Sequence, residues 1–90
     1  MPKYVIERKV PGVGKLNQRD RKAAAMKSVK ALKDLGPDIQ WIHSYVSENK
    51  THCVYLAKNK KLIKEHAERS GFPANKITKV DYIMEPLTAE

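Results

Sequence analysis

The sequence has little of several residue types that often reveal a protein's chemistry. Its 90 residues include one cysteine, one tryptophan, one phenylalanine and four glycines. Because Cys53 is the only thiol, the chain forms no internal disulfide, which fits a reducing compartment. No apolar run approaches the roughly 20 residues that a membrane-spanning helix needs. Residues 1–9 do not show the basic region and following apolar run that are typical of a secretion signal. We therefore expect a cytoplasmic protein without a membrane segment.

Catalytic motifs are also missing. The sequence has no C-x-x-C pair, no H-E-x-x-H metal motif, no activated nucleophile and no cofactor fingerprint. These absences favour a binding protein over an enzyme of any named reaction, although the enzyme question stays open at this point.

Charge and composition indicate one small folded domain, residues 1–90. Hydrophobic residues make up 41% of the chain and charged residues 31%, with a net charge of +8. The basic residues are dispersed over two predicted helices, within residues 15–33 and 58–64. Helices commonly turn such side chains to water, so we expect a solvated surface rather than a nucleic-acid site.

Apolar periodicity predicts four strands and two helices. The expected strands cover residues 3–10, 39–47, 51–57 and 76–85, and the expected helices cover residues 17–35 and 58–70. Asn17 suits a helix N-cap, and Gly36 and Gly71 suit helix ends. The expected inner face of the first helix consists of Met26, Val29, Leu32 and Leu35.

The order β-α-β-β-α-β is that of a ferredoxin-like α+β sandwich. In this fold two helices cover one face of a four-stranded antiparallel sheet. We expect the last residues, 86–90, to form a frayed tail.

The segment WIHSYVSENKTHCVY, residues 41–55, concentrates aromatic and ligand-type side chains in a predicted hairpin. If ENK is the loop, residues 45 and 53 pair, and alternation places Ile42 and Val54 beneath the helices. The opposite face would then carry Trp41, His43, Tyr45, Cys53 and Tyr55. Because monomers rarely expose such a face, we expect a homodimer that packs sheet against sheet.

Some of these side chains are common ligands of divalent transition ions. His43 and His66 offer imidazoles, Cys53 offers a thiolate, and Glu7 lies one strand away. Two ligands per chain, doubled by a two-fold axis, would complete a site at a dimer interface. On the residues alone, the simpler interpretation is structural histidines and a small buried cysteine.

Two other functions fit the pattern less closely. A small-ligand binder or enzyme would use an apolar cavity between sheet and helices, with His43 as an acid–base group beside Tyr45 and Tyr55. Trp41 would also contact the bound group. RNA-binding modules share this element order, but THCVYLA, residues 51–57, lacks their motif of basic, glycine and aromatic residues.

The motifs H-S-Y-V, C-V-Y, E-H-A and G-x-P-A-x-x-I give the chain a resemblance to a known family. From Tyr4 to Met84 it resembles the small nickel-binding-protein family, which is also known as a domain of unknown function. The resemblance implies a ferredoxin-like fold, a dimer, and binding of nickel or a similar divalent ion. It also implies the following functional residues: His43, Tyr45, Cys53, Tyr55, Glu65 and His66. We therefore predict a small metal-binding protein.

Overall fold

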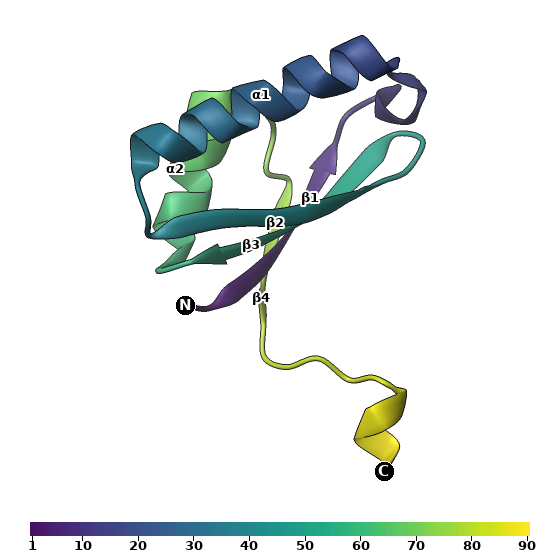
Figure 1. Ribbon diagram of the computed structural model, residues 1–90, viewed down its shortest axis with the longest axis vertical. Coiled ribbons are helices and arrows are strands. Elements are labelled where there is room, and N and C mark those ends of the chain that lie inside the picture. The colour runs from purple at the N-terminus through teal and green to yellow at the C-terminus, as the bar shows by residue number, and fades with distance from the viewer.

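The four strands form one antiparallel sheet in the order β2-β3-β1-β4 (Figure 1). The computed structural model describes all residues, 1–90. The strands are β1 (Lys3–Lys9), β2 (Ile39–Val46), β3 (Lys50–Ala57) and β4 (Lys76–Val80). β1 lies between β3 and β4 and runs antiparallel to both. Each helix therefore connects two parallel strands that have a third strand between them, which confirms the predicted ferredoxin-like fold.

The first helix, α1 (Gln18–Leu35), starts and stops where the sequence predicts. The Asn17 side chain accepts a hydrogen bond from the backbone nitrogen of Asp20 at 2.8 Å. This bond satisfies one of the amides that a first helical turn leaves free. The helix ends at Gly36, whose φ of 87° lies in the region that favours glycine.

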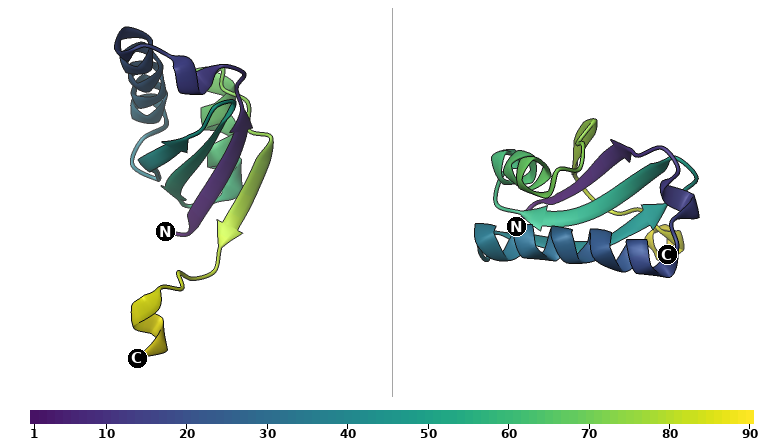
Figure 2. Two further views of the ribbon diagram at one scale, coloured as in Figure 1. Left: turned by 90° about the vertical axis from the view of Figure 1, so that its right-hand side faces the viewer. Right: turned by 90° about the horizontal axis from the view of Figure 1, so that it is seen from above.

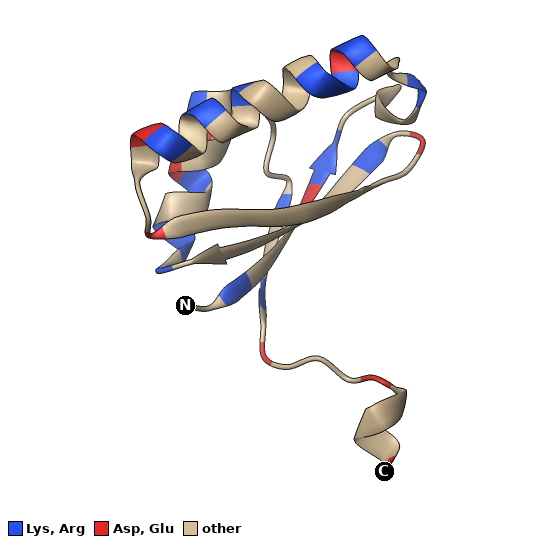
Figure 3. Ribbon diagram, in the orientation of Figure 1, with Lys and Arg blue, Asp and Glu red and all other residues tan.

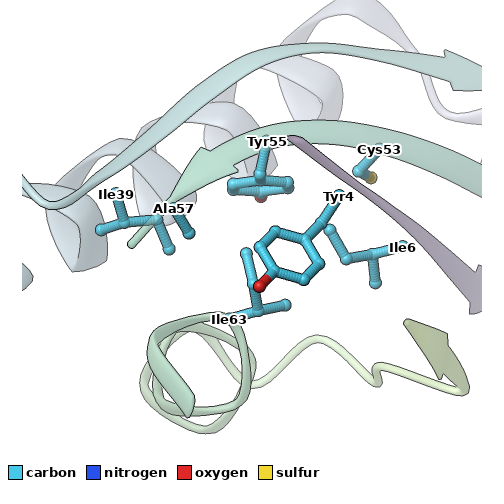
Figure 4. Close-up of a cluster of buried hydrophobic side chains, with 7 residues drawn as sticks. All are labelled: Tyr4, Ile6, Ile39, Cys53, Tyr55, Ala57 and Ile63. Carbon is cyan, nitrogen blue, oxygen red and sulfur yellow. The ribbon is translucent and has the colours of Figure 1, made fainter. Parts of the chain in front are cut away.

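The second helix, α2 (Lys60–Ser70), packs beside α1 on the same face of the sheet (Figure 2). Its N-cap is Asn59, whose side chain accepts from the backbone nitrogen of Leu62 at 3.0 Å. The core lies between this helix layer and the sheet (Figure 4). The buried core cluster consists of Tyr4, Ile6, Ile39, Cys53, Tyr55, Ala57 and Ile63.

The side of β3 that faces the core carries residues that we predicted on the open face. Cys53 and Tyr55 are 6% and 2% exposed, and both belong to the core beneath the helices. Val54 lies between them and points to the open face. The prediction for β3 is therefore wrong. The hairpin pairs one residue away from the expected register, so that Tyr45 pairs with His52.

β2 also departs from regular alternation, because it contains a β-bulge. Trp41 pairs with Tyr55, but the next paired residue is His43, opposite Val54. Ile42 is the extra residue. A bulge of this kind puts two residues opposite one and reverses the alternation that follows it.

The bulge divides the aromatic residues of β2 between the two faces of the sheet. Trp41 faces the helices, and its Nε1 donates a hydrogen bond to the Oγ of Ser44 at 2.9 Å. In a regular strand these two side chains would lie on opposite faces. The prediction for Trp41 is therefore wrong, whereas His43 and Tyr45 lie on the open face as predicted.

Mostly small side chains form the part of α1 that faces the sheet. This stripe consists of Ala24, Ser28, Ala31, Leu32 and Leu35. Leu32 and Leu35 confirm the prediction, but Met26 and Val29 are 62% and 41% exposed, so their predicted place on the inner face is wrong. The observed stripe and the predicted inner face both follow an interval of three to four residues. This interval alone does not show which of the two faces the sheet.

Residues 81–90 leave the body of the molecule (Figures 1 and 2). β4 ends at Val80, so the predicted strand over 76–85 is too long. A short 3-10 helix, η2 (Pro86–Ala89), follows an irregular stretch. The large apolar side chains exposed along this tail are Tyr82, Ile83, Met84 and Leu87. The buried core therefore lies entirely before the tail.

Candidate functional site

The open face of the sheet presents an imidazole next to a phenol. The Nε2 of His43 lies 3.1 Å from the hydroxyl oxygen of Tyr45. The two rings meet edge to face, with centroids 4.9 Å apart. Tyr45 is 64% exposed, and His43 is exposed as well. Both groups are therefore accessible to a ligand or to a second chain.

A second histidine, His52, lies on the same open face. It pairs with Tyr45 of β2 on one side and with Glu7 of β1 on the other. His43 pairs with Val54, two residues along β3 from His52, so the two histidines are diagonal neighbours across the β2–β3 pair. The expected register put His52 and His43 on opposite faces of the hairpin, so the sequence did not predict that the two histidines are neighbours.

Glu7 is already held by a cation. The Nζ of Lys50 lies 3.0 Å from the Oε1 of Glu7, and this is the one ion pair in the structure. The hydrogen bond and the charge of Lys50 lower the pKa of Glu7 below its ordinary value. Glu7 is therefore ionised at neutral pH, and a metal ion would compete with Lys50 for its carboxylate.

Cys53 lies on the opposite side of the sheet from His43. Its thiol is buried, 3.4 Å from the Oγ1 of Thr51. The predicted ligand pair of His43 and Cys53 is therefore wrong, because the sheet separates the two side chains. The same separation rules out the predicted acid–base arrangement in which Tyr55 flanks His43.

His66 is buried between α2 and α1, with 1% of its surface exposed. Its Nε2 lies 3.2 Å from the Oγ of Ser28 and 3.3 Å from the carbonyl oxygen of the same residue. Its ring packs against that of Tyr55, with centroids 5.2 Å apart. Burial lowers the pKa of His66, and the hydrogen bond to the Ser28 carbonyl opposes this change only in part. His66 thus has the hydrogen-bonded structural role that was the simpler of the two interpretations.

No three His, Cys, Asp or Glu side chains come together to hold a metal ion within one chain. The predicted ligands are divided instead. His43 and Glu7 lie on the open face, Cys53 and His66 lie in the core, and Glu65 is half-buried on α2.

A cavity of about 370 Å³ lies on the other side of the sheet, beneath the N-terminal half of α1. It occupies the place where the small-ligand hypothesis expects an apolar cavity. Its aromatic wall consists of Trp41, Tyr55 and Phe72, and two arginines, Arg8 and Arg21, also line it. The lining comes from segments far apart in the sequence, so no local motif marked these residues as a group.

Positive charge is spread over the molecule. Figure 3 shows Lys and Arg along both helices and on the strands, not gathered in one patch. The chain has no helix that is both long enough and apolar enough to cross a bilayer.

These features define a small ferredoxin-like protein with an open, histidine-bearing sheet face and a cavity beneath its helices. The model of a family described as nickel responsive protein SCO4226-like matches residues 4–80, and the chain belongs to this family. The match confirms the family that the hairpin and α2 motifs predicted. No curated protein matches the sequence.

The fold is similar to a solved structure. The crystal structure of SCO4226 from Streptomyces coelicolor A3(2) matches with a TM-score of 0.75 and 13% sequence identity. The match covers 91% of this chain and 99% of that one. At this identity the likeness establishes the fold alone.

Proposed function

We propose that this protein takes part in the response to nickel, or to a similar divalent transition ion, by binding it at the open face of the sheet between two copies of the chain. The family description, nickel responsive protein, supports the choice of ion. The observation that carries the proposal is that His43 and His52 are neighbours on one open face. Imidazole nitrogens are good ligands for nickel and its neighbours in the Irving–Williams order.

One chain alone does not fit a complete nickel site, because fewer than three suitable side chains converge. A two-fold axis through the open face would supply each donor twice, so that two pairs of histidines meet. Glu7 lies beside His52 and would add a carboxylate if it exchanged Lys50 for the metal. Cys53 and His66 take no part, because they are buried on the far side of the sheet.

The middle of the open face is apolar enough for a second copy of the chain to pack against it. Val5 and Val54 pair there, and Leu56 lies one step along β3 on the same face. All three are half-buried, and Tyr45 beside them is largely exposed. Burying a contiguous apolar strip of this kind is a common reason for association. Metal binding and dimerisation would therefore share one surface.

Titration calorimetry of the untagged protein with nickel tests the proposal. We expect saturable heat for the wild type and at least a tenfold weaker affinity for His43→Ala and for His52→Ala, because each removes a ligand. Cys53→Ala is the matched control: it removes a soft ligand-type atom that the fold keeps out of reach, and it should bind nickel as the wild type does. Absence of heat for the wild type would refute metal binding, and loss of binding in Cys53→Ala would refute the site.

Sedimentation of the wild type over a dilution series, with and without nickel, tests the shared surface. We expect a dimer whose dissociation constant falls when nickel is added, because a ligand that bridges two copies stabilises their association. If the protein is a monomer and binds nickel with full affinity, the proposed interface is wrong and one chain is sufficient to bind the ion.

A further inference from the structure

The cavity beneath α1 arises from a mismatch of side-chain size. α1 presents Ala24, Ala25 and Ser28 to it, while the sheet presents Trp41 and Tyr55. A well-packed interior would fill this space with larger helix residues, because cores approach the packing density of organic crystals. Small residues on the helix thus keep open a volume of about 370 Å³, which lies in the range of small-molecule sites.

Arg8 supplies the cavity with a buried charge that no acidic side chain neutralises. Arg8 is 3% exposed, and the one ion pair in the chain lies elsewhere. Its Nη1 donates to the carbonyl oxygen of Pro73 at 2.8 Å and makes a longer contact of 3.4 Å with that of Phe72. Both of these hydrogen bonds leave from Nη1, although a guanidinium has five N–H donors. A buried cation without a counterion is costly, and an anion in the adjoining cavity would offset that cost.

A second guanidinium stands at the same cavity. Arg21 of α1 lines it, and the Nε of Arg21 donates to the carbonyl oxygen of Leu16 at 2.8 Å. This bond holds the Arg21 side chain against Leu16, another residue of the lining. No Asp or Glu belongs to the lining. Two arginines without an acid give the cavity a positive potential.

We propose that this cavity binds a small organic carboxylate with an apolar body. The carboxylate would accept hydrogen bonds from Arg8, since guanidinium groups suit the planar geometry of carboxylates. The body would lie against Trp41, Tyr55 and Phe72, whose rings form the apolar wall. This site lies on the opposite side of the sheet from His43 and His52, so it does not depend on the proposed metal site.

Trp41 is the only tryptophan and lines the cavity, so its fluorescence reports occupancy. The probes are phenylacetate, its neutral analogue phenylacetamide, and inorganic phosphate, each titrated into the full chain in the presence of a chelator. We expect a saturable change with phenylacetate, an affinity about 10- to 100-fold weaker for the amide, and no saturation with phosphate, because charge-assisted hydrogen bonds act together with apolar burial. Equal binding of the amide, saturation by phosphate alone, or no change with phenylacetate would overturn the proposal.

Variants locate the site. Arg8→Met keeps an unbranched, flexible side chain and removes the charged guanidinium, and it should weaken phenylacetate binding about 10- to 100-fold. Arg19→Met removes an exposed arginine of α1 that is not part of the lining, and His43→Ala removes the proposed metal ligand. Both should bind phenylacetate like the wild type. Ala25→Leu fills the cavity from the helix and should abolish the fluorescence change even if Arg8→Met fails to fold. Unchanged affinity in Ala25→Leu would overturn the site.

Discussion

The Nε2 of His66 on α2 lies 3.3 Å from the carbonyl oxygen of Ser28 on α1, which ties the two helices together inside the core. The carbonyl can only accept, so the proton of a neutral His66 ring lies on Nε2. The Nδ1 is then a bare acceptor, buried and without a partner. Protonation would place a charged N–H in that position, where nothing accepts it. The helix contact thus requires a neutral imidazole.

This contact predicts acid sensitivity. Burial lowers the pKa of His66 in the folded state, so between the ordinary histidine pKa and the folded one the unfolded chain binds the extra proton. Stability contributed by His66 is therefore complete above the unfolded pKa of about 6.5 and is lost as the pH falls below it. Urea unfolding between about pH 8 and about pH 5 should show the free energy of unfolding decreasing in this window.

Two variants separate His66 from the other histidines. His66→Gln retains an amide donor for the Ser28 carbonyl but does not titrate, so its unfolding free energy should depend less on pH. His43→Gln changes an exposed histidine and should keep the pH dependence of the wild type. Equal slopes for the wild type and His66→Gln would contradict the neutral-histidine account.

The core contacts predict a sharp contrast between two apolar residues of the helices. Ile63 of α2 is 0% exposed within the core cluster, whereas Met26 of α1 is 62% exposed. Ile63→Ala should lower the free energy of unfolding by about 2–5 kcal/mol, because it leaves a cavity. Met26→Ala should change it by less than about 0.5 kcal/mol. Chemical denaturation measures both changes. A large decrease in the free energy of unfolding of Met26→Ala would contradict the exposed position of this residue.

The fold was predictable because its signals are local. Apolar periodicity gives the elements, and single residues such as Asn17 and Gly36 mark where a helix begins and ends. The order of elements then leaves few ways to arrange one sheet. None of these inferences depends on the exact register between strands. They are therefore correct although the predicted register of the β2–β3 hairpin is wrong.

The faces of the hairpin were not predictable in the same way. The loop between β2 and β3 is residues 47–49 and not 48–50, and either segment has residues suited to a turn. No glycine or proline occurs at or next to Ile42, so the sequence has no local signal for the bulge. Each is a difference of one residue, yet a one-residue shift moves every following side chain to the other face. The separation of His43 from Cys53 follows from the shifted loop, and the place of Trp41 on the helix side follows from the bulge.

A close approach of backbone predicts the effect of one glycine. Gly14 lies against the β2–β3 turn, and its nitrogen donates to the carbonyl oxygen of Glu48 at 3.0 Å. A Cβ built on Gly14 would lie 2.6 Å from the carbonyl oxygen of Ser47, which is too short for two non-bonded atoms. Gly14→Ala should therefore lower the free energy of unfolding by about 1–3 kcal/mol, by strain in this contact. Thermal denaturation of Gly14→Ala is compared with that of Lys15→Ala, which changes an exposed neighbour. Equal melting temperatures of the two variants would contradict the close approach.

The position of the tail predicts that its removal leaves the domain intact. Residues 81–90 contribute no side chain to the buried core, so a chain that ends at Val80 should keep its free energy of unfolding within about 0.5 kcal/mol. A chain that ends at Asn75 is the matched comparison. It loses β4, which pairs with β1, and Ile77, which packs against the core, and it should fail to fold cooperatively. Circular dichroism through thermal denaturation distinguishes the two truncations. A substantial loss of stability in the longer chain would show that the tail's exposed apolar residues are covered in solution, and dependence of that loss on protein concentration would assign the cover to a second copy.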